Sequence, residues 1–108
     1  MTVFGVVTWI IRPDKLGEFT EWYKTFLEWM KEHPDLFREV KSRRLFSHLI
    51  GGNVGGYVEM WELENMAEWE KWYNKVILQS EYMTKLYPEA AVLEVPGSES
   101  TSVWSFVM

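Results

Sequence analysis

A chain of 108 residues has the length of one domain. Its aromatic fraction of 17% is too high for a disordered chain, and the lack of cysteine excludes disulfides and thiolate chemistry. The net charge is −5 and no basic stripe is present to neutralise phosphates, so we expect no nucleic-acid partner.

Residues 2–11 form an apolar, β-branched run that predicts a strand rather than a helix. Both of its faces are apolar, which is typical of a central strand that is covered on both sides. One face carries Val3, Gly5, Val7, Trp9 and Ile11, and the other carries Phe4, Val6, Thr8 and Ile10.

The next segment predicts a helix over residues 14–32. Pro13 ends the strand, and Asp14 is a good residue for capping the first turn. Pro34 limits continuation of the helix at its far end. Apolar side chains recur at steps of three and four and make one face of the helix, namely Leu16, Phe19, Tyr23, Phe26 and Met30, widened by Trp22 and Trp29.

Two further strands are expected over residues 40–50 and 57–63, joined by a glycine-rich loop at residues 51–56. So many glycines indicate positive φ angles at several positions. On the strand at residues 57–63, Tyr57, Glu59 and Trp61 share one face. Val58, Met60 and Glu62 share the other face.

A second helix begins after Asn65, because Glu68 follows three positions later in a capping-box arrangement. Its helical pattern extends, with a break, towards Leu86. Residues 89–95 are either a short strand or an extended connection, and residues 96–100 form a loop. Residues 101–108 alternate as a last strand.

The order βαββαβ predicts a single α+β domain over residues 1–108 with a ferredoxin-like fold. Such a domain has a four-stranded antiparallel sheet with both helices on one face and with strands one and three in the centre. The helices cover only one face of the apolar first strand. We therefore expect a homodimer in which a second sheet covers the other face.

The passage WELENMAEWEKW at residues 61–72 contains a strand that ends in Trp, a capped turn and an aromatic-rich helix. With this order of elements, the chain resembles the dimeric α/β-barrel superfamily. Within it, the chain is similar to the antibiotic-biosynthesis-monooxygenase and NIPSNAP-like families. The resemblance implies two ferredoxin-like units joined sheet to sheet, and a pocket in each subunit between the helices and the sheet.

Haem-degrading members of the superfamily use an Asn on the first strand, and a Trp and a later His on the second helix. A rough alignment places Thr8, Trp72 and Tyr82 at these three positions. Only Trp72 matches, so the resemblance does not imply haem degradation. We expect no cofactor.

Histidine chemistry has two candidates. His33 lies in the last turn of the first helix, where the helix dipole stabilises a positively charged side chain. His48, near the glycine-rich loop, is a candidate general base, although a hydrogen-bonded strand histidine is the simpler interpretation. Glu59, Glu62 and His48 could meet across the hairpin only in one strand register, so no metal site is predicted.

The aromatic side chains are the remaining signal, because they could form a flat pocket for a planar or aromatic molecule. The candidate ligand-binding residues are Thr8, Trp9, Trp72 and Tyr73, and the candidate catalytic residues are His48 and Tyr82. The alternative is that single aromatic residues at helical spacing belong to the core.

Three hypotheses follow. The first is a cofactor-independent enzyme, monooxygenase- or isomerase-like; the second is a non-catalytic binding dimer; the third is an assembly protein without a ligand. A titratable group with a shifted pKa inside a pocket favours the first. A pocket without such a group favours the second, and a filled core favours the third.

The expected compartment follows from two absences in the sequence. Residues 1–4 lack the basic region and cleavage site of a signal peptide. No apolar run approaches the ~20 residues of a membrane span. The expectation is a cytoplasmic protein with no membrane partner.

Overall fold

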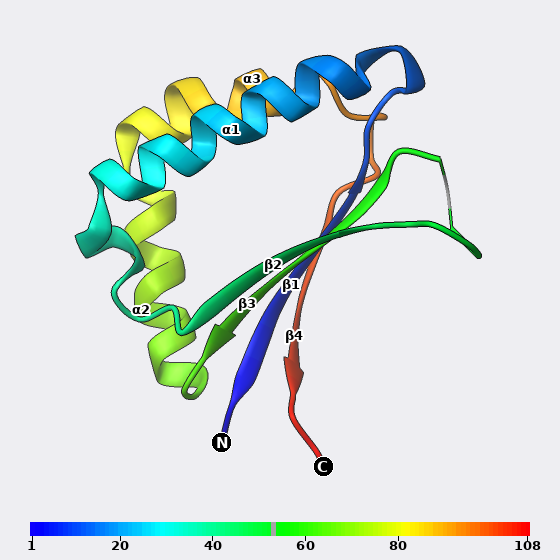
Figure 1. The fold of residues 1–108 in the computed structure, drawn as a ribbon. Helices are drawn as coiled ribbons and strands as arrows, with labels where there is room; N and C mark the ends of the chain where they lie inside the picture. The colour runs from blue at the N-terminus through cyan, green and yellow to red at the C-terminus, as the bar shows by residue number, and fades with distance from the viewer. Residues whose placement is uncertain (53) are drawn as a thin grey trace.

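The computed structural model describes residues 1–52 and 54–108. Four strands form one sheet in the order β2-β3-β1-β4, and every neighbouring pair is antiparallel. The helices lie on one face of this sheet (Figure 1). The predicted ferredoxin-like α+β fold is confirmed. The strands are β1 (Val3–Ile10), β2 (Ser42–Ser47), β3 (Gly56–Leu63) and β4 (Ser100–Ser105).

Strand β1 lies in the centre of the sheet, between β3 and β4, as its two apolar faces predicted. Val3 and Val6 lie on opposite faces, and each is only 1% exposed. Gly5, Val7 and Trp9 share the face of Val3, which is the face towards the helices.

Helix α1 (Leu16–Glu32) buries the predicted aromatic face against the sheet through Phe19, Tyr23, Phe26 and Trp29. Its start differs from the prediction. Asp14 caps no helix, because the chain first makes a 3-10 turn over Pro13–Lys15 and Lys15 then occupies the cap position of α1. Pro13, with its fixed φ, opens this turn and leaves Asp14 inside it.

The β2–β3 hairpin has shorter strands than expected, since β2 spans Ser42–Ser47 rather than residues 40–50. Gly51 and Gly55 adopt φ angles of +82° and +80°, as the glycine-rich loop predicted. These left-handed residues end the strand pairing and turn the chain. Asn53, in the same loop, lies outside the described residues.

Helix α2 (Met66–Ile77) begins where the capping box predicted. The Asn65 side chain accepts a hydrogen bond from the backbone N–H of Glu68, at 2.9 Å. After a break, a π-helical turn (Tyr82–Leu86) leads directly into α3 (Tyr87–Ala91). The expected continuation of the helical pattern is thus present as two short elements.

Two expectations near the C-terminus were wrong in part. Residues 89–91 are helical, and only Glu94, within the expected 89–95 segment, makes a single bridge, to Ile11. Strand β4 begins at Ser100 and ends at Ser105 instead of running over residues 101–108. Its neighbour β1 begins at Val3, the partner of Ser105, and beyond that pair the Phe106 N–H donates to the Thr2 carbonyl at 3.1 Å before the pairing ends.

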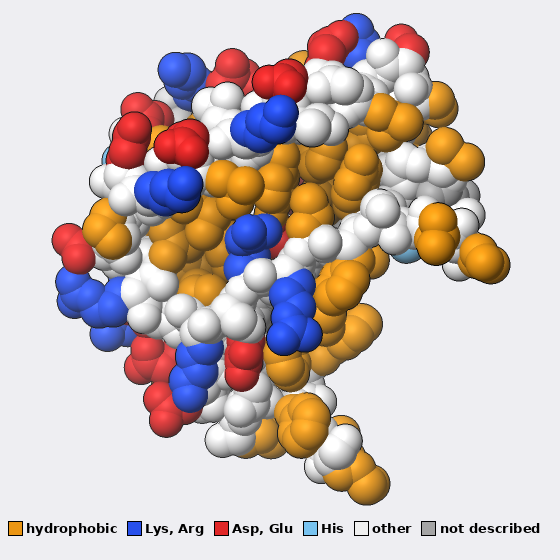
Figure 2. All heavy atoms as spheres, in the orientation of Figure 1, with side chains coloured by type: hydrophobic (Ala, Val, Ile, Leu, Met, Phe, Trp, Pro, Cys, Tyr) orange, Lys and Arg blue, Asp and Glu red, His pale blue; other side chains and the backbone are white. Residues whose placement is uncertain are grey.

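The helices and the sheet enclose the aromatic core, but they do not close it on every side. Figure 2 shows apolar side chains inside a hollow between α1 and β2, with charged side chains gathered along the outer surface of α1. Apolar side chains thus line the hollow, while the charged side chains of α1 lie outside it. No helix among the described residues is long and apolar enough to cross a membrane.

Candidate functional site

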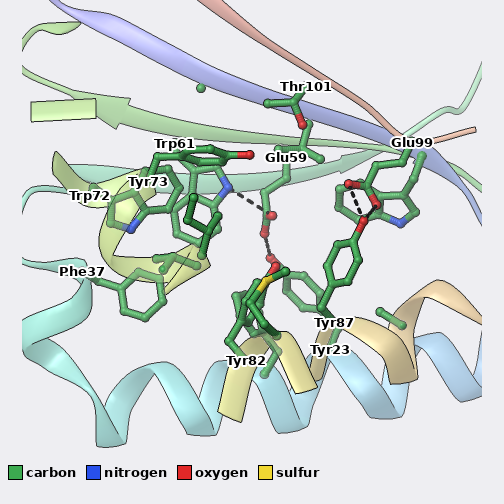
Figure 3. A pocket seen from close by; sticks show the side chains of 18 of the residues that line it. Tyr23, Phe37, Glu59, Trp61, Trp72, Tyr73, Tyr82, Tyr87, Glu99 and Thr101 are labelled. Carbon is green, nitrogen blue, oxygen red and sulfur yellow. Dashed lines mark hydrogen bonds between the residues drawn. The ribbon is translucent and has the colours of Figure 1, made fainter. Parts of the chain in front are cut away.

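A cavity of about 270 Å³ lies between the inner face of the sheet and the helices. Strands β1 and β3 supply its floor, while α1, α2, the π-helical turn and α3 supply its walls (Figure 3). Most of the lining side chains are aromatic. Four residues proposed from the sequence line this cavity, namely Trp9, Trp72, Tyr73 and Tyr82.

One carboxyl group, that of Glu59, reaches from the sheet towards the helices (Figure 3). Glu59 is 7% exposed. The Tyr23 hydroxyl donates to its Oε2 atom, and the Trp61 indole N–H donates to its Oε1 atom at 3.1 Å. Burial raises the pKa of Glu59 to about 7, against the opposing effects of Tyr23, Arg43 and Trp61. This carboxyl can therefore exchange a proton near neutral pH.

Arg43 on β2 contacts the hydroxyl of Tyr23 and lies near the Glu59 carboxyl. Its Nη1 atom donates to the Tyr23 hydroxyl at 2.6 Å and lies 4.0 Å from Glu59 Oε2. The guanidinium also lies over the Tyr23 ring, 5.5 Å from its centroid. Burial and the Glu59 carboxyl raise the pKa of Tyr23, so the hydroxyl stays neutral and remains a donor.

Tyr82 rises from the π-helical turn into the cavity (Figure 3). Burial, followed by the charges of Glu59 and Glu99, raises the pKa of its hydroxyl. The group therefore stays protonated throughout the neutral range. It is available as a neutral hydrogen-bond donor or acceptor on the helix side of the cavity.

A second acidic group lies where β4 begins. The Tyr87 hydroxyl donates to Glu99, at 3.2 Å from each carboxyl oxygen. Glu94 also lines the cavity, and its carboxyl lies close enough to Glu99 for the charge of Glu99 to act on it. Burial and the charge of Glu99 raise the pKa of Glu94 to about 7.

Two indole N–H groups of the lining residues have no hydrogen-bond partner among the described residues. These are the buried Nε1 atoms of Trp9 and Trp72, whose side chains are 7% and 6% exposed. A buried donor without an acceptor costs about 1–3 kcal/mol. A guest molecule with acceptor atoms would recover part of that cost.

The structure separates the other sequence candidates from this cavity. Thr8 pairs with Val58 and lies on the outer face of the sheet, opposite to Trp9. His48 follows β2 at the exposed hairpin end and does not line the cavity.

The possible metal-ligand group of Glu59, Glu62 and His48 does not come together either. Glu59 lies on the inner face of β3, while Glu62 faces outwards and accepts a hydrogen bond from Ser42 at 2.7 Å. Within residues 1–52 and 54–108, no group of three His, Asp or Glu side chains is arranged to hold a metal ion.

Sequence reasoning missed Glu59 as the central group of the site. The signal was present in the period of two, which puts one glutamate between Tyr57 and Trp61 on an inward face. The contact between Glu94 and Glu99 left no such signal. It depends on the bridge from Glu94 to Ile11 and on the register of β4.

No family model matches this sequence, and no curated protein matches it. Solved structures do match. A NIPSNAP family protein from Agrobacterium tumefaciens has a TM-score of 0.74 at 14% identity, over 97% of this chain and 92% of its own. An antibiotic biosynthesis monooxygenase has a TM-score of 0.69 at 15% identity, over 98% and 99% of the two chains.

A dimeric protein of unknown function with a ferredoxin-like fold, from Bacteroides fragilis, has a TM-score of 0.64 at 14% identity. The match covers 97% of this chain and 96% of that one. Identities this low establish the fold alone. The chain thus has the ferredoxin-like fold of NIPSNAP family proteins and of an antibiotic biosynthesis monooxygenase, as its sequence resemblance implied.

Proposed function

We propose that this protein is a homodimeric, isomerase-like enzyme that moves a proton on a small planar molecule held in the aromatic cavity, with Glu59 as the acid–base group. The observation that carries the proposal is the buried carboxyl of Glu59, whose pKa is raised to about 7 inside the cavity. A carboxyl with that pKa is matched to proton transfer at neutral pH.

The cavity supports a planar substrate of modest size. Its volume of about 270 Å³ is close to the lower end of the ~300–1,000 Å³ of small-molecule sites. The lining rings offer flat apolar surfaces, and the unpaired indole N–H groups of Trp9 and Trp72 favour a guest that carries acceptor atoms.

The proposed reaction needs one base and no second reactant. The Glu59 carboxylate takes a proton from a C–H group attached to the planar π system, and the electron pair of that bond stays in the π system. The protonated carboxyl, whose proton can exchange with water, then delivers a proton to another atom of the substrate. Tyr82, which remains neutral, is positioned on the helix side as a hydrogen-bond donor to the substrate.

Three side chains act on Glu59 rather than on the substrate. Tyr23 and Trp61 each donate a hydrogen bond to one of its oxygens, which holds the carboxyl in one orientation. Arg43 in turn holds the Tyr23 hydroxyl. Their hydrogen bonds and charge oppose the effect of burial, and they keep the pKa of Glu59 from rising further.

The dimer is proposed on the outer face of the sheet. This face carries a group of apolar side chains, including Phe4, Met60, Phe46 and Trp104, of which Phe46 and Trp104 are 45% and 51% exposed. An apolar face of this kind is typical of an interface. The dimeric relative in fold from Bacteroides fragilis supports the same arrangement.

The experiment measures hydrogen–deuterium exchange at the activated CH₂ groups of 2-tetralone, a bicyclic ketone, by NMR in D₂O. We expect the protein to accelerate the exchange, and we expect E59Q to lose about 100-fold or more of that rate because the amide is no base. The rate should rise with pH through about 7 as Glu59 becomes a carboxylate.

The matched control is E62Q, since Glu62 lies on the same strand and faces outwards. It should exchange at the rate of the parent protein. Equal rates for E59Q and the parent, or no acceleration by the parent, would contradict the proposal.

A further inference from the structure

The cavity has an unbalanced charge. Three carboxyl groups line it, those of Glu59, Glu94 and Glu99, and no Lys, Arg or His occurs among the described residues of the lining. Arg43 lies behind Tyr23 and compensates only for Glu59, from which it is 4.0 Å away. The end of the cavity that holds Glu94 and Glu99 has no such compensation within the lining.

Glu94 and Glu99 both line this end of the cavity, where burial and the charge of Glu99 raise the pKa of Glu94. Two neighbouring carboxylates repel each other, and a cation placed beside them would relieve that repulsion. Tyr87 donates to Glu99 but brings no charge. Arg12 is nearby, and its Nε atom donates to the backbone carbonyl of Glu94, at 3.3 Å, rather than to either carboxyl.

The negative charge is not confined to one end of the cavity. Tyr82 lines the cavity together with Glu59 and Glu99, and burial and the charges of both carboxyls raise the pKa of its hydroxyl. The faces of the lining aromatic rings are also electron-rich and attract cations. Carboxyl groups and ring faces together make the cavity favourable for a positive guest.

A second feature of the lining concerns hydrogen bonding. Trp9 lines the cavity and is 7% exposed, and its indole N–H has no partner among residues 1–52 and 54–108. The buried indole N–H of Trp72 likewise has no partner among these residues. Donors of this kind are completed by an acceptor, which a purely hydrocarbon cation would lack.

We infer that the ligand of this cavity is a planar aromatic cation, such as an N-alkylated or protonated heterocycle, that also carries an oxygen acceptor. Its charged nitrogen lies at the end formed by Glu94 and Glu99, and its ring extends towards Glu59. The inference rests on the proposed function and names its substrate class. A positively charged ring also accepts the electron pair that remains after Glu59 removes a proton more readily than a neutral ring does.

Three probes of matched shape and different charge test the inference. They are 1-methylnicotinamide, a cation with a carboxamide oxygen; 3-methylbenzamide, its neutral analogue; and 3-methylbenzoate, an anion. Binding is measured at pH 7.5 by NMR titration of ¹⁵N-labelled protein. We expect the cation to bind at least about tenfold more tightly than the neutral amide, with the anion weakest, and we expect the Trp9 or Trp72 indole signals to shift.

The double variant E94Q/E99Q should reduce the preference for the cation to less than about threefold and leave the affinity for 3-methylbenzamide unchanged. Its control is E70Q/E89Q, which removes the same formal charge at exposed helix positions outside the cavity lining. That control should keep the preference.

Equal affinities of the parent for cation and neutral amide would overturn the inference, and so would an equal loss in the control variant. In both cases the proton-transfer function would stand, because the exchange assay with the neutral ketone tests it separately. Failure of all three probes to bind would overturn the inference, and absent ketone exchange would independently overturn the function.

Discussion

Glu59 illustrates how the surroundings of one residue set its ionisation. A carboxyl group ordinarily ionises near pH 4.5, but burial of this side chain raises its pKa to about 7. The cost of an ionised group in an apolar site is lowered by the Tyr23 and Trp61 donors and by Arg43, but it is not removed. The residue therefore links acid–base chemistry to folding stability.

This link predicts how stability depends on pH. Between pH 4.5 and about 7 the folded protein retains the Glu59 proton while the unfolded chain loses it. The contribution of Glu59 to the free energy of unfolding should therefore be largest below pH 4.5 and fall by up to about 3 kcal/mol as the pH rises towards about 7. Glu94, whose pKa is raised as well, contributes in the same direction. Glu39, whose pKa is lowered, contributes in the opposite direction.

Urea denaturation at pH 5 and pH 8 checks this prediction. The E59Q variant has no proton to lose at this position, so its unfolding free energy should fall less than that of the parent over the same interval. E62Q should follow the parent, because Glu62 lies on the outer face. A decrease of the same size in E59Q and the parent would show that Glu59 is not responsible.

At the scale of elements, α2 carries several of the cavity walls. Its residues Trp69, Trp72, Tyr73 and Val76 all line the cavity. Trp69 and Tyr73 stack with their ring centroids 4.9 Å apart. Trp69 also lies directly over Gly5, where an added Cβ atom would be 2.9 Å from the indole nitrogen. The strand glycine thus allows the helix to approach the sheet.

The start of α2 depends on the Asn65 cap, which accepts a hydrogen bond from the Glu68 N–H. We expect N65A to lower the free energy of unfolding by about 1 kcal/mol, because one N–H group of the first turn loses its acceptor. Asn74, at an exposed position within the same helix, provides the control. N74A should cost nothing or stabilise slightly, since alanine is the better helix former.

Chemical denaturation of the three proteins measures these effects. Equal midpoints for N65A and the parent would mean that the cap does not stabilise α2.

At the scale of the whole molecule, the helices cover only one face of the sheet (Figure 1). The other face exposes apolar side chains on all four strands, which is costly in water for a chain of 108 residues. A second sheet packed on this face would bury it, and we expect the interface to exceed ~1,200 Å² in total.

Sedimentation at micromolar concentration tests this assembly. The parent should sediment as a dimer of 12.9 kDa chains. The M60K variant should shift towards the monomer, because Met60 lies in the middle of the sheet opposite Val6 and a lysine there would bury its charge. L78K is the control, since Leu78 is 82% exposed at the end of α2. A monomeric parent would contradict the expectation.

The sequence alone determined the features that depend on neighbouring residues. The apolar, β-branched run in residues 2–11, with two apolar faces, identified the central strand, and spacings of three and four identified the buried face of α1. The Asn65 capping box located the start of α2. These signals are local, because they follow from the geometry of one strand or one helix.

The tertiary structure decided what depends on pairing between distant segments. Strand register put Trp9 in the cavity and Thr8 outside it, and it left His48 at the hairpin end. The end of β1 limited β4. The raised pKa of Glu59 arises only when the packed chain removes water from its carboxyl, and Glu94 and Glu99 come together only in the folded chain. Register and desolvation are collective properties of the folded chain, so a local pattern does not specify them.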